Sequence, residues 1–243
     1  MTHHAGGTVT ATLAVRTADG KRHTFPLDGL ADAPLETYLD QRPIPRFLDQ
    51  QNTTGWYWSN TGRRHLRYES YLERKWLTVF DFRSDIIGIS TQPLHIFGID
   101  HGSPWEHDPD VFVRMSDGTG CLVDVRLAAR ATRPRAVQQS ERTRRLCGLA
   151  GLDYRAVTEQ DLDPTVWANL DWLAPYRRDA DFPEGLLEEL LDGAAVPITI
   201  GDLIAAAGDP LIARAAVMHL CWHQRLLFDL GEVMNDDTPV ARA

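Results

Sequence analysis

The apolar residues near the N-terminus alternate with polar ones, as in a strand with one buried face. Residues 8–16 follow this two-residue period, residues 18–20 favour a turn, and residues 22–27 can form a returning strand. Residues 28–66 keep no clear period and contain several prolines, so short helices and turns are expected there. The chain is therefore expected to begin with a β-hairpin and an accessory region.

A helical period follows. Between residues 67 and 80, Leu72, Trp76 and Val79 lie at i, i+4 and i+7, which places them on one face of an amphipathic helix. Two acidic residues, Glu69 and Glu73, are spaced one turn apart beside this apolar stripe.

The period then returns to two. Residues 86–90 and 95–99 are predicted strand pieces, and residues 110–115 and 121–127 are predicted strands joined by the turn at residues 116–120. A helix, a β-meander and a crossover helix form an α/β core.

The pattern after the meander is mostly helical. An arginine-rich helix is expected at residues 136–150 and a further strand at residues 154–157. Beyond Pro183, three short helices are expected at residues 186–191, 200–207 and 211–226, followed by a final extended piece. The predicted domains are residues 1–64 (hairpin and accessory region), 65–178 (core) and 179–243 (small C-terminal module).

Composition agrees with an ordinary globular chain. The 243 residues are 43% hydrophobic and 24% charged, values typical of a folded domain with a sizeable core. The longest uncharged apolar stretch, residues 86–99, is interrupted by Pro93 and too short to span a bilayer. The N-terminus lacks the pattern of a signal peptide, and the three cysteines form no C-x-x-C pair. We expect a cytoplasmic protein with reduced thiols and no membrane association.

The net charge of −9 is unevenly distributed. Residues 179–243 contain 12 acidic and 3 basic residues, whereas residues 1–178 contain 22 of each. Residues 126–145 contain seven arginines and a single acid, Glu141, so this segment can contact phosphates although the whole chain is acidic. A solvated helix face is the alternative interpretation. The arginines assigned to DNA binding are Arg130, Arg133, Arg135, Arg142, Arg144 and Arg145.

Charged residues interrupt an otherwise apolar strand. Asp124 and Arg126 share one face of residues 121–127, and charges on a central strand are costly unless they are paired or bind a ligand. The preceding hairpin can bring Asp110 close to Asp124, and the helix can supply Glu73 as a third carboxylate. Clustered carboxylates favour Mg²⁺ or Mn²⁺. The alternative for Asp124 and Arg126 is an edge-strand charge pair of little consequence.

Four short segments occur in the order of a known motif set. They are residues 70–74 (SYLER), 92–93 (QP), 107–112 (HDPDVF) and 123–126 (VDVR). Together they resemble the PD-(D/E)xK nuclease superfamily, and most closely its TnsA-like transposase endonuclease subunits, over roughly residues 65–175. The resemblance implies a restriction-endonuclease-like core, a mixed sheet flanked by helices, and a small C-terminal winged-helix-like module.

The resemblance also implies an activity and a set of site residues. Such a subunit cuts DNA at transposon ends beside a DDE transposase, with an AAA+ ATPase as a further candidate partner. Glu73, Asp110 and Asp124 would be catalytic carboxylates that bind Mg²⁺, for which Mn²⁺ can substitute. Arg126 occupies the position of the motif lysine, and Gln92 is expected near the site.

Two positions depart from the family pattern. Arg126 replaces a lysine, and a guanidinium stabilises an anion but cannot take a proton. Asp124 replaces the commoner Glu or Gln and has a shorter reach. Lys75 is on the helix of Glu73, but two residues correspond to about 200° around the axis. Spacing does not decide between Glu69 and Glu73, and the motif favours Glu73.

Three functional hypotheses follow from these patterns. The first is a metal-dependent DNA endonuclease subunit. The second is a catalytically inactive relative that binds DNA or partner proteins. The third is a transcriptional regulator built on the C-terminal module, which has few cations for phosphate contact, so we expect that module to bind protein instead. His219 and His223 are one helical turn apart, but no carboxylate accompanies them as in a zinc motif, and packing is the favoured interpretation.

Overall fold

The computed structural model describes residues 10–41, 53–100 and 102–243. The chain forms two compact units, the first comprising residues 1–81 and 85–161, and the second residues 82–84 and 162–243. The described residues contain seven α-helices and four sheets, so the predicted mixed α/β class is confirmed.

A mixed four-stranded sheet lies at the centre of the first unit. Its strand order is β10-β9-β8-β5, with β9 antiparallel to β8, β8 antiparallel to β5, and β10 parallel to β9. The strand of Asp124, β9, is a central strand, because it is hydrogen-bonded to a neighbour on both sides. The strands are β5 (Ile86–Thr91), β8 (Val111–Met115), β9 (Gly120–Val125) and β10 (Asp153–Val157).

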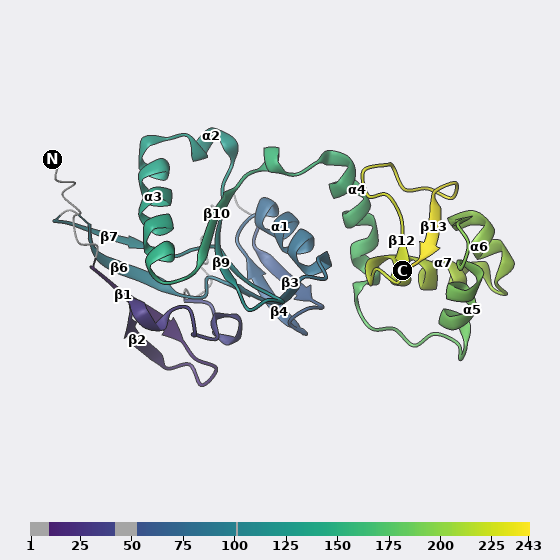
Figure 1. The fold of residues 1–243 in the computed structure, drawn as a ribbon, viewed down its shortest axis with the longest axis horizontal. Coiled ribbons are helices and arrows are strands. Elements are labelled where there is room, and N and C mark those ends of the chain that lie inside the picture. The colour runs from purple at the N-terminus through teal and green to yellow at the C-terminus, as the bar shows by residue number, and fades with distance from the viewer. Residues whose placement is uncertain (1–9, 42–52, 101) are drawn as a thin grey trace. The chain divides into compact units, whose positions relative to one another are not determined.

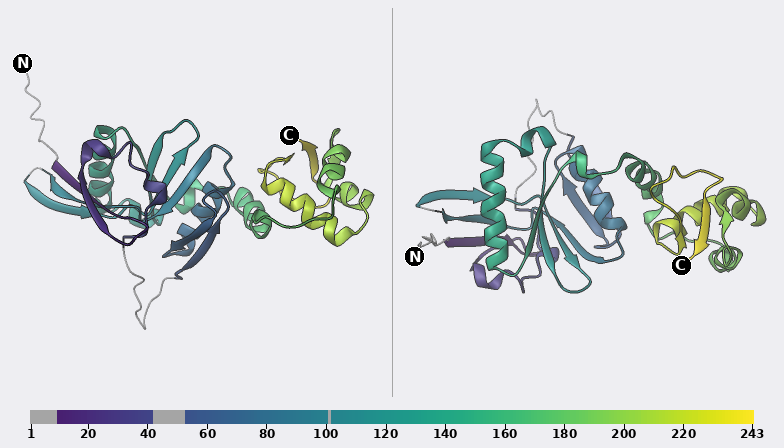
Figure 2. Two further views of the ribbon diagram at one scale, coloured as in Figure 1. Left: turned by 90° about the horizontal axis from the view of Figure 1, so that it is seen from below. Right: turned by 45° about the horizontal axis from the view of Figure 1, so that its top comes forward.

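Two helices lie on opposite sides of this sheet, as Figures 1 and 2 show for α3 and α1. Helix α1 (Tyr71–Phe82) buries Trp76, Leu77 and Phe80, so the amphipathic helix is confirmed, with a start four residues later than predicted. Helix α3 (Pro134–Leu149) follows the short α2 (Ala128–Ala131) and connects β9 to β10. A crossover of this kind is what two parallel neighbouring strands require.

A second sheet of the first unit has the order β2-β1-β6-β7. The N-terminal hairpin is confirmed, but β6 pairs with β1 and β7 instead of continuing the central sheet from β5. Pro93 lies between β5 and β6 and lacks the N–H that a continuous ladder needs, which explains the change of sheet. The strands are β1 (Thr10–Arg16), β2 (Arg22–Pro26), β6 (His95–Asp100) and β7 (Ser103–His107), and the 3₁₀ turns η1 (Leu27–Gly29) and η2 (Leu35–Thr37) follow β2.

The prediction of short helices and turns for residues 28–66 is wrong in its last part. There the chain forms an antiparallel hairpin of β3 (Gly55–Ser59) and β4 (Arg64–Tyr68). Its aromatic residues have high strand propensity, and the Asn-Thr-Gly sequence after Ser59 supplies the turn. The buried carboxylate of Asp81 accepts hydrogen bonds from the Tyr57 and Ser59 hydroxyls and from the backbone N–H groups of Asn60 and Thr61, at 2.8–2.9 Å. One carboxylate therefore connects α1 to this hairpin.

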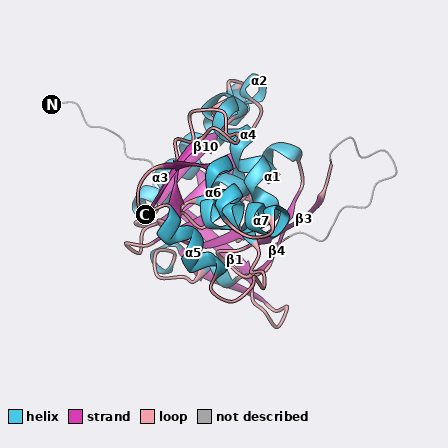
Figure 3. Cartoon of the chain, turned by 90° about the vertical axis from the view of Figure 1, so that its right-hand side faces the viewer, coloured by secondary structure: helices cyan, strands magenta, loops and turns pink. Residues whose placement is uncertain are grey.

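The second unit contains a separate apolar core. Figure 3 labels its helices α4, α5, α6 and α7. Its elements are α4 (Pro164–Leu173), η4 (Ala174–Arg177), α5 (Leu186–Gly193), β11 (Ile198–Thr199), α6 (Ile200–Ala206), α7 (Pro210–Trp222), β12 (Leu226–Leu227) and β13 (Pro239–Arg242). The three small strands form a sheet in the order β11-β13-β12. The caps are regular, since Thr199 and Asp209 each accept backbone N–H groups at the starts of α6 and α7.

The main segment of this unit begins at Leu162, whereas the sequence-based division starts the C-terminal module at residue 179. The difference arises because α4 belongs to the second core. Buried Asn169 on α4 donates to the carbonyls of Leu230 and Glu232 and accepts from the N–H of Met234. Such long-range contacts cannot be read from local periodicity.

Two smaller predictions concern membranes and thiols. No helix in the described ranges is long and apolar enough to cross a membrane. Cys121, Cys147 and Cys221 are buried free thiols, and burial raises the pKa values of Cys147 and Cys221 to about 12. The prediction of reduced cysteines without a disulfide agrees with this arrangement.

Candidate active site

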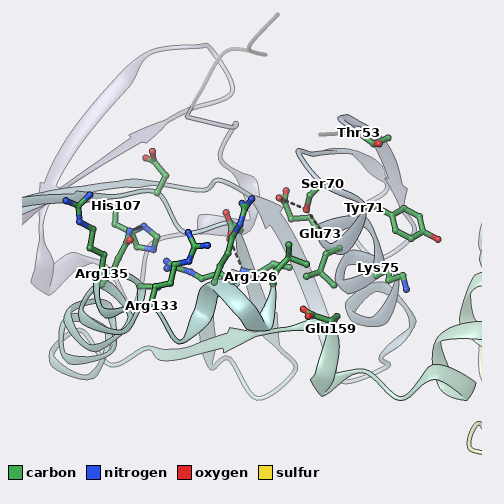
Figure 4. A pocket seen from close by; sticks show the side chains of 18 residues that line it. Thr53, Ser70, Tyr71, Glu73, Lys75, His107, Arg126, Arg133, Arg135 and Glu159 are labelled. Carbon is green, nitrogen blue, oxygen red and sulfur yellow. Dashed lines mark hydrogen bonds between the residues drawn. The ribbon is translucent and has the colours of Figure 1, made fainter. Parts of the chain in front are cut away.

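A cavity of about 900 Å³ in the first unit opens between α1, the ends of β8 and β9, and the start of α3. Figure 4 shows Arg126 between Glu73 on one side and Arg133 and Arg135 on the other. The charged, histidine and amide side chains that line it are those of Glu73, Lys75, His107, Asp108, Asp110, Arg126, Arg130, Arg133, Arg135, Gln139 and Glu159.

Asp110 is the residue immediately before β8. Its Oδ2 accepts the backbone N–H of Val125 at 2.7 Å, and its carbonyl accepts the N–H of Gln92 at 2.9 Å. These bonds fix the carboxylate at the junction of β8, β9 and the end of β5. Burial, followed by the charges of Asp124 and Glu73, raises the pKa of Asp110 well above its ordinary value. The helix and both strands thus bring three carboxylates close enough to repel one another.

Glu73 is held by the start of α1. The Ser70 hydroxyl accepts the backbone N–H of Glu73 at 3.1 Å and donates to Glu73 Oε1 at 3.0 Å, while Oε2 accepts the N–H of Glu69 at 2.8 Å. This arrangement has the Ser-x-x-Glu spacing of a capping box, but the carboxylate accepts the backbone N–H of Glu69 instead of that of Ser70. Burial is the first cause of the raised pKa of Glu73. Glu69 instead accepts from Arg67 at 2.8 Å, so Glu73 is the acid that lines the cavity.

Asp124 is fully buried and does not line the cavity wall. Its Oδ1 contacts His107 Nε2 at 2.8 Å, and its Oδ2 accepts from Arg126 at 2.7 Å and from the Tyr154 hydroxyl at 2.8 Å. Burial alone would raise the pKa of Asp124, but the bond to His107 and the charges of His107 and Arg126 lower it. Both oxygens are therefore engaged by donors, and Asp124 stays ionised.

Two partners of Asp124, His107 and Tyr154, were not predicted from the sequence. His107 lies at the end of β7 and lines the cavity, where its Nδ1 contacts the side-chain amide of Gln139 on α3. Tyr154 on β10 reaches Asp124 because β10 is the parallel neighbour of β9. Only the HDPD segment gave a local signal for His107, and Tyr154 depends wholly on strand pairing.

Gln92 lies beside the carboxylates without lining the cavity. It is buried, has a φ of +45°, and accepts from Arg67 through Oε1 at 2.5 Å. A positive φ is uncommon for a residue other than glycine. Gln92 is near the site, as predicted, because its backbone N–H binds the carbonyl of Asp110.

The arginines assigned to DNA binding divide into two groups. Arg130, Arg133 and Arg135 are exposed, line the cavity and form no ion pair with the described residues. The other three have intramolecular contacts: Arg142 and Arg145 bind the buried carboxylate of Asp100 at 2.7 and 3.0 Å, and Arg144 lies over the Tyr154 ring at 5.5 Å. The predicted basic segment thus supplies three cations to the cavity besides Arg126.

The carboxylates fit a hard cation only in part. Glu73 and Asp110 present oxygen ligands of the type Mg²⁺ prefers, and their mutual repulsion would be relieved by a cation. Asp124 has both oxygens occupied, so binding a cation would require it to release a donor. No group of three or more His, Cys, Asp or Glu side chains in the described segments is arranged to hold a metal ion. His219 and His223 pack against each other with ring centroids 4.3 Å apart.

The comparisons with known proteins identify no relative. No protein-family model matches the chain, and no curated protein is detectably similar to it.

Proposed function

We propose that the protein is a metal-dependent DNA endonuclease subunit that acts within a heteromeric transposase. The observation that carries this proposal is the cavity in which Glu73, Asp110 and Arg126 meet Arg130 and Arg133, two arginines that form no ion pair within the described part of the chain. A metal-dependent hydrolysis of a phosphodiester needs carboxylates and cationic side chains together. The carboxylates hold the metal ion, and the arginines bind the phosphate.

Each side chain has a separate task in this proposal. Glu73 and Asp110 would hold Mg²⁺ or Mn²⁺, which lowers the pKa of a bound water and stabilises charge on the phosphate. Arg126 faces the same space with a permanent positive charge, so it can stabilise the anion that develops on the phosphate but cannot take a proton. Asp124 orients Arg126 through its 2.7 Å ion pair, and His107 and Tyr154 in turn orient Asp124.

The fold supports the resemblance to the PD-(D/E)xK nucleases. In the first unit a helix, three antiparallel strands, a second helix and a parallel strand follow in order as α1, β5, β8, β9, α3 and β10, with β6 and β7 inserted between β5 and β8. The proposed restriction-endonuclease-like core is this mixed sheet with its flanking helices. Among PD-(D/E)xK proteins, the TnsA-like subunits are the ones whose motif order resembles this chain most, and they work with a DDE transposase.

The test combines metal binding with cleavage. Calorimetric titration of Mn²⁺ should give binding to the wild type that is lost in Asp110→Ala, and the wild type should nick supercoiled DNA in a reconstituted transposase. Nicking should fall at least about 100-fold in Asp110→Ala, while circular dichroism remains unchanged. Undiminished cleavage by Asp110→Ala would exclude this active site.

Arg126 is tested by two substitutions. Arg126→Ala should reduce nicking roughly 100-fold because it removes the charge, whereas Arg126→Lys should retain most of the rate because a lysine keeps it. Equal rates for wild type and Arg126→Ala would show that the charge has no role. Arg155→Ala is the matched control, because Arg155 is exposed on β10 and does not line the cavity.

A second candidate is an inactive relative that binds DNA or a partner. The observation that favours it is the saturation of Asp124, whose two oxygens are both occupied by side chains of the protein. Under this alternative Arg126 is a structural partner of Asp124. Affinity for DNA without metal binding or nicking, measured in the presence of the transposase subunits, would establish the alternative.

The second unit supports a protein partner. From α5 onward, its order of helix, strand, two helices and two antiparallel strands agrees with the proposed winged-helix-like module. The second unit contains six arginines against 14 acidic residues, and two of the arginines are in ion pairs: Arg214 with Asp236 at 2.6 Å and Arg242 with Asp192 at 2.9 Å. We therefore assign to this unit the binding of a transposase or an AAA+ ATPase subunit. Arg214→Gln should leave DNA affinity unchanged, and a loss of affinity would contradict the assignment.

A further inference from the structure

A second cavity of the first unit lies beside the candidate active site. It has a volume of about 460 Å³ and is lined by Arg16, Gly20, Arg22, Gln41, His95 and Asp108. Asp108 also lines the larger cavity, so the two adjoin at this residue.

Two arginines face each other across the ladder at its rim. Arg16, at the end of β1, is the register partner of Arg22, at the start of β2, so both side chains emerge on the same face of the hairpin. Both residues are exposed, and neither has an ion pair with any residue in the described ranges. Like charges directly opposite each other destabilise a hairpin. A bound anion would remove this repulsion.

The other charges nearby are already paired. Asp108 Oδ1 contacts His95 Nδ1 at 2.7 Å, and Glu106 lies 3.8 Å from His95 Nε2. Lys21, between the two arginines in sequence, is paired with Asp19 at 2.9 Å. The acids therefore lie against His95 and Lys21, and the two guanidinium groups keep their positive charge for a ligand.

The turn of the hairpin keeps the rim open. Gly20 has a φ of +79°, a conformation that residues with a side chain rarely adopt. No side chain therefore projects from this position of the cavity wall. The Thr17 hydroxyl and backbone both bind within the turn, which holds Arg16 and Arg22 in register.

We propose that this second cavity is a phosphate subsite for the DNA backbone, in which Arg16 and Arg22 clamp a phosphate of the strand that passes the carboxylates. The proposal rests on the proposed nuclease function and extends it. In this proposal the DNA strand runs from Arg130 and Arg133 past Asp108 to the hairpin of β1 and β2. The subsite thus contacts DNA at a position separated from the scissile phosphate.

The test uses the full chain, with Asp110→Ala in every sample to prevent cleavage. Fluorescence anisotropy measures the affinity for labelled duplexes that are extended one base pair at a time on one side of the cleavage position. The Arg16→Gln, Arg22→Gln variant is compared with the control Arg155→Gln, Arg225→Gln, in which two exposed arginines away from both cavities are changed. A second titration uses inorganic phosphate alone.

The parent protein in this test is the Asp110→Ala variant. We expect its affinity for DNA to increase in one step when the duplex reaches a certain length, and the Arg16→Gln, Arg22→Gln variant to lack that step. For long duplexes this variant should bind roughly tenfold more weakly, and the dependence of log K on log salt should be reduced by about 2, because two phosphate contacts are lost. The control should keep the step. Circular dichroism and melting temperature verify that both variants fold.

The remaining outcomes separate the two proposals. If the parent binds DNA and the Arg16→Gln, Arg22→Gln variant binds every duplex as tightly as the parent does, the subsite is excluded and the nuclease proposal stands. If this variant loses only its binding of inorganic phosphate, the cavity takes a free anion and the DNA assignment is wrong. If the parent binds no DNA with its partners present, both proposals fail together.

Discussion

The two units of the chain differ in what they bury. In the described residues, the first unit buries the charged or ionisable side chains of Arg67, Asp81, Asp100, His107 and Asp124, whereas the buried polar residues of the second unit are the uncharged Asn169 and Thr238. Burying a charge is costly unless it is paired and hydrogen-bonded. The second unit is built mainly by apolar packing, and the first adds a set of polar connections.

The buried charges of the first unit lie where elements must be oriented. Asp81 connects α1 to the β3–β4 hairpin, Asp100 connects β6 to α3 through two arginines, and Asp124 connects β7, β9 and β10. Each carboxylate satisfies several donors from other elements, so its replacement would leave those donors unpaired. The cavity is enclosed by these same elements. Charge is therefore buried in the unit that has to position a site.

The largest expected effect is at Asp81. Asp81→Ala leaves two hydroxyls and two backbone N–H groups without their acceptor, and we expect the free energy of unfolding of the first unit to fall by about 3–5 kcal/mol. Urea denaturation combined with segment-resolved hydrogen exchange measures it. Asp32→Ala, an exposed acid, is the control and should change stability by less than about 0.5 kcal/mol. A loss below about 1 kcal/mol at Asp81 would contradict the comparison.

An uncharged connection in the second unit should matter less. Asn169→Ala removes three hydrogen bonds to residues 230–234, and we expect a loss of about 2 kcal/mol in the second unit. Hydrogen exchange of α4 and α7 should increase, while exchange in β8 and β9 should not. Glu188→Ala, an exposed position on α5, provides the reference. Equal losses for Asn169→Ala and Asp81→Ala would remove the distinction between the units.

The ionised carboxylate of Asp110 should destabilise the folded protein when no cation is bound. The pKa of Asp110 is raised in the folded protein, so folding favours its protonated form. Stability therefore falls as pH rises from the ordinary carboxyl pKa of 3.8 to the raised pKa, and it stays at the lower level above that. In metal-free buffer at pH 7.5, Asp110→Asn should therefore stabilise the protein by about 1 kcal/mol.

This gain should disappear below the ordinary carboxyl pKa of 3.8, where the acid is protonated in both folded and unfolded protein. Melting temperatures at pH 7.5 and 3.5, with EDTA present, measure the difference. Added Mg²⁺ should stabilise the wild type and not Asp110→Asn. No gain at neutral pH would show that the carboxylates do not repel one another.

The smallest effect is expected on the surface of the second unit. Leu211, at the start of α7, is 82% exposed, so Leu211→Ser should change the free energy of unfolding by less than about 0.5 kcal/mol. Thermal denaturation of the isolated chain measures it. A loss above about 1 kcal/mol would mean that Leu211 is covered by another chain in solution, and the comparison of the two cores would then have to include that contact.

Local patterns predicted most of the elements. Helix α1, the strands of the central sheet, α3 and the three helices α5, α6 and α7 all occur close to their predicted positions, because their apolar periods are long and uninterrupted. The neighbours of each strand could not be predicted in the same way. The assignment of β6 to the sheet of β1 depends on contacts between residues more than 80 positions apart, which no local period encodes.

The candidate site likewise contains residues that local sequence predicted and residues that depend on strand pairing. Glu73 and Asp110 were predicted from motif spacing, and the structure brings both to one cavity. The full burial of Asp124 by His107 and Tyr154 required knowledge of which strands are neighbours. Half of the predicted DNA-binding arginines are engaged within the protein. Two of them bind Asp100, at the end of a strand that local sequence could not connect to α3, and Arg144 lies over Tyr154.

The pairing of β1 with β6 has a consequence for synthesis of the chain. Because Thr10–Arg16 closes its second ladder only when His95–Asp100 is available, the N-terminal hairpin remains without its neighbour until about 100 residues have left the ribosome. An unpaired strand edge exposed for that time is a site for wrong association. Arg16 and Arg22 place two positive charges at the turn end of this hairpin, and charged side chains close to an exposed strand edge oppose such association.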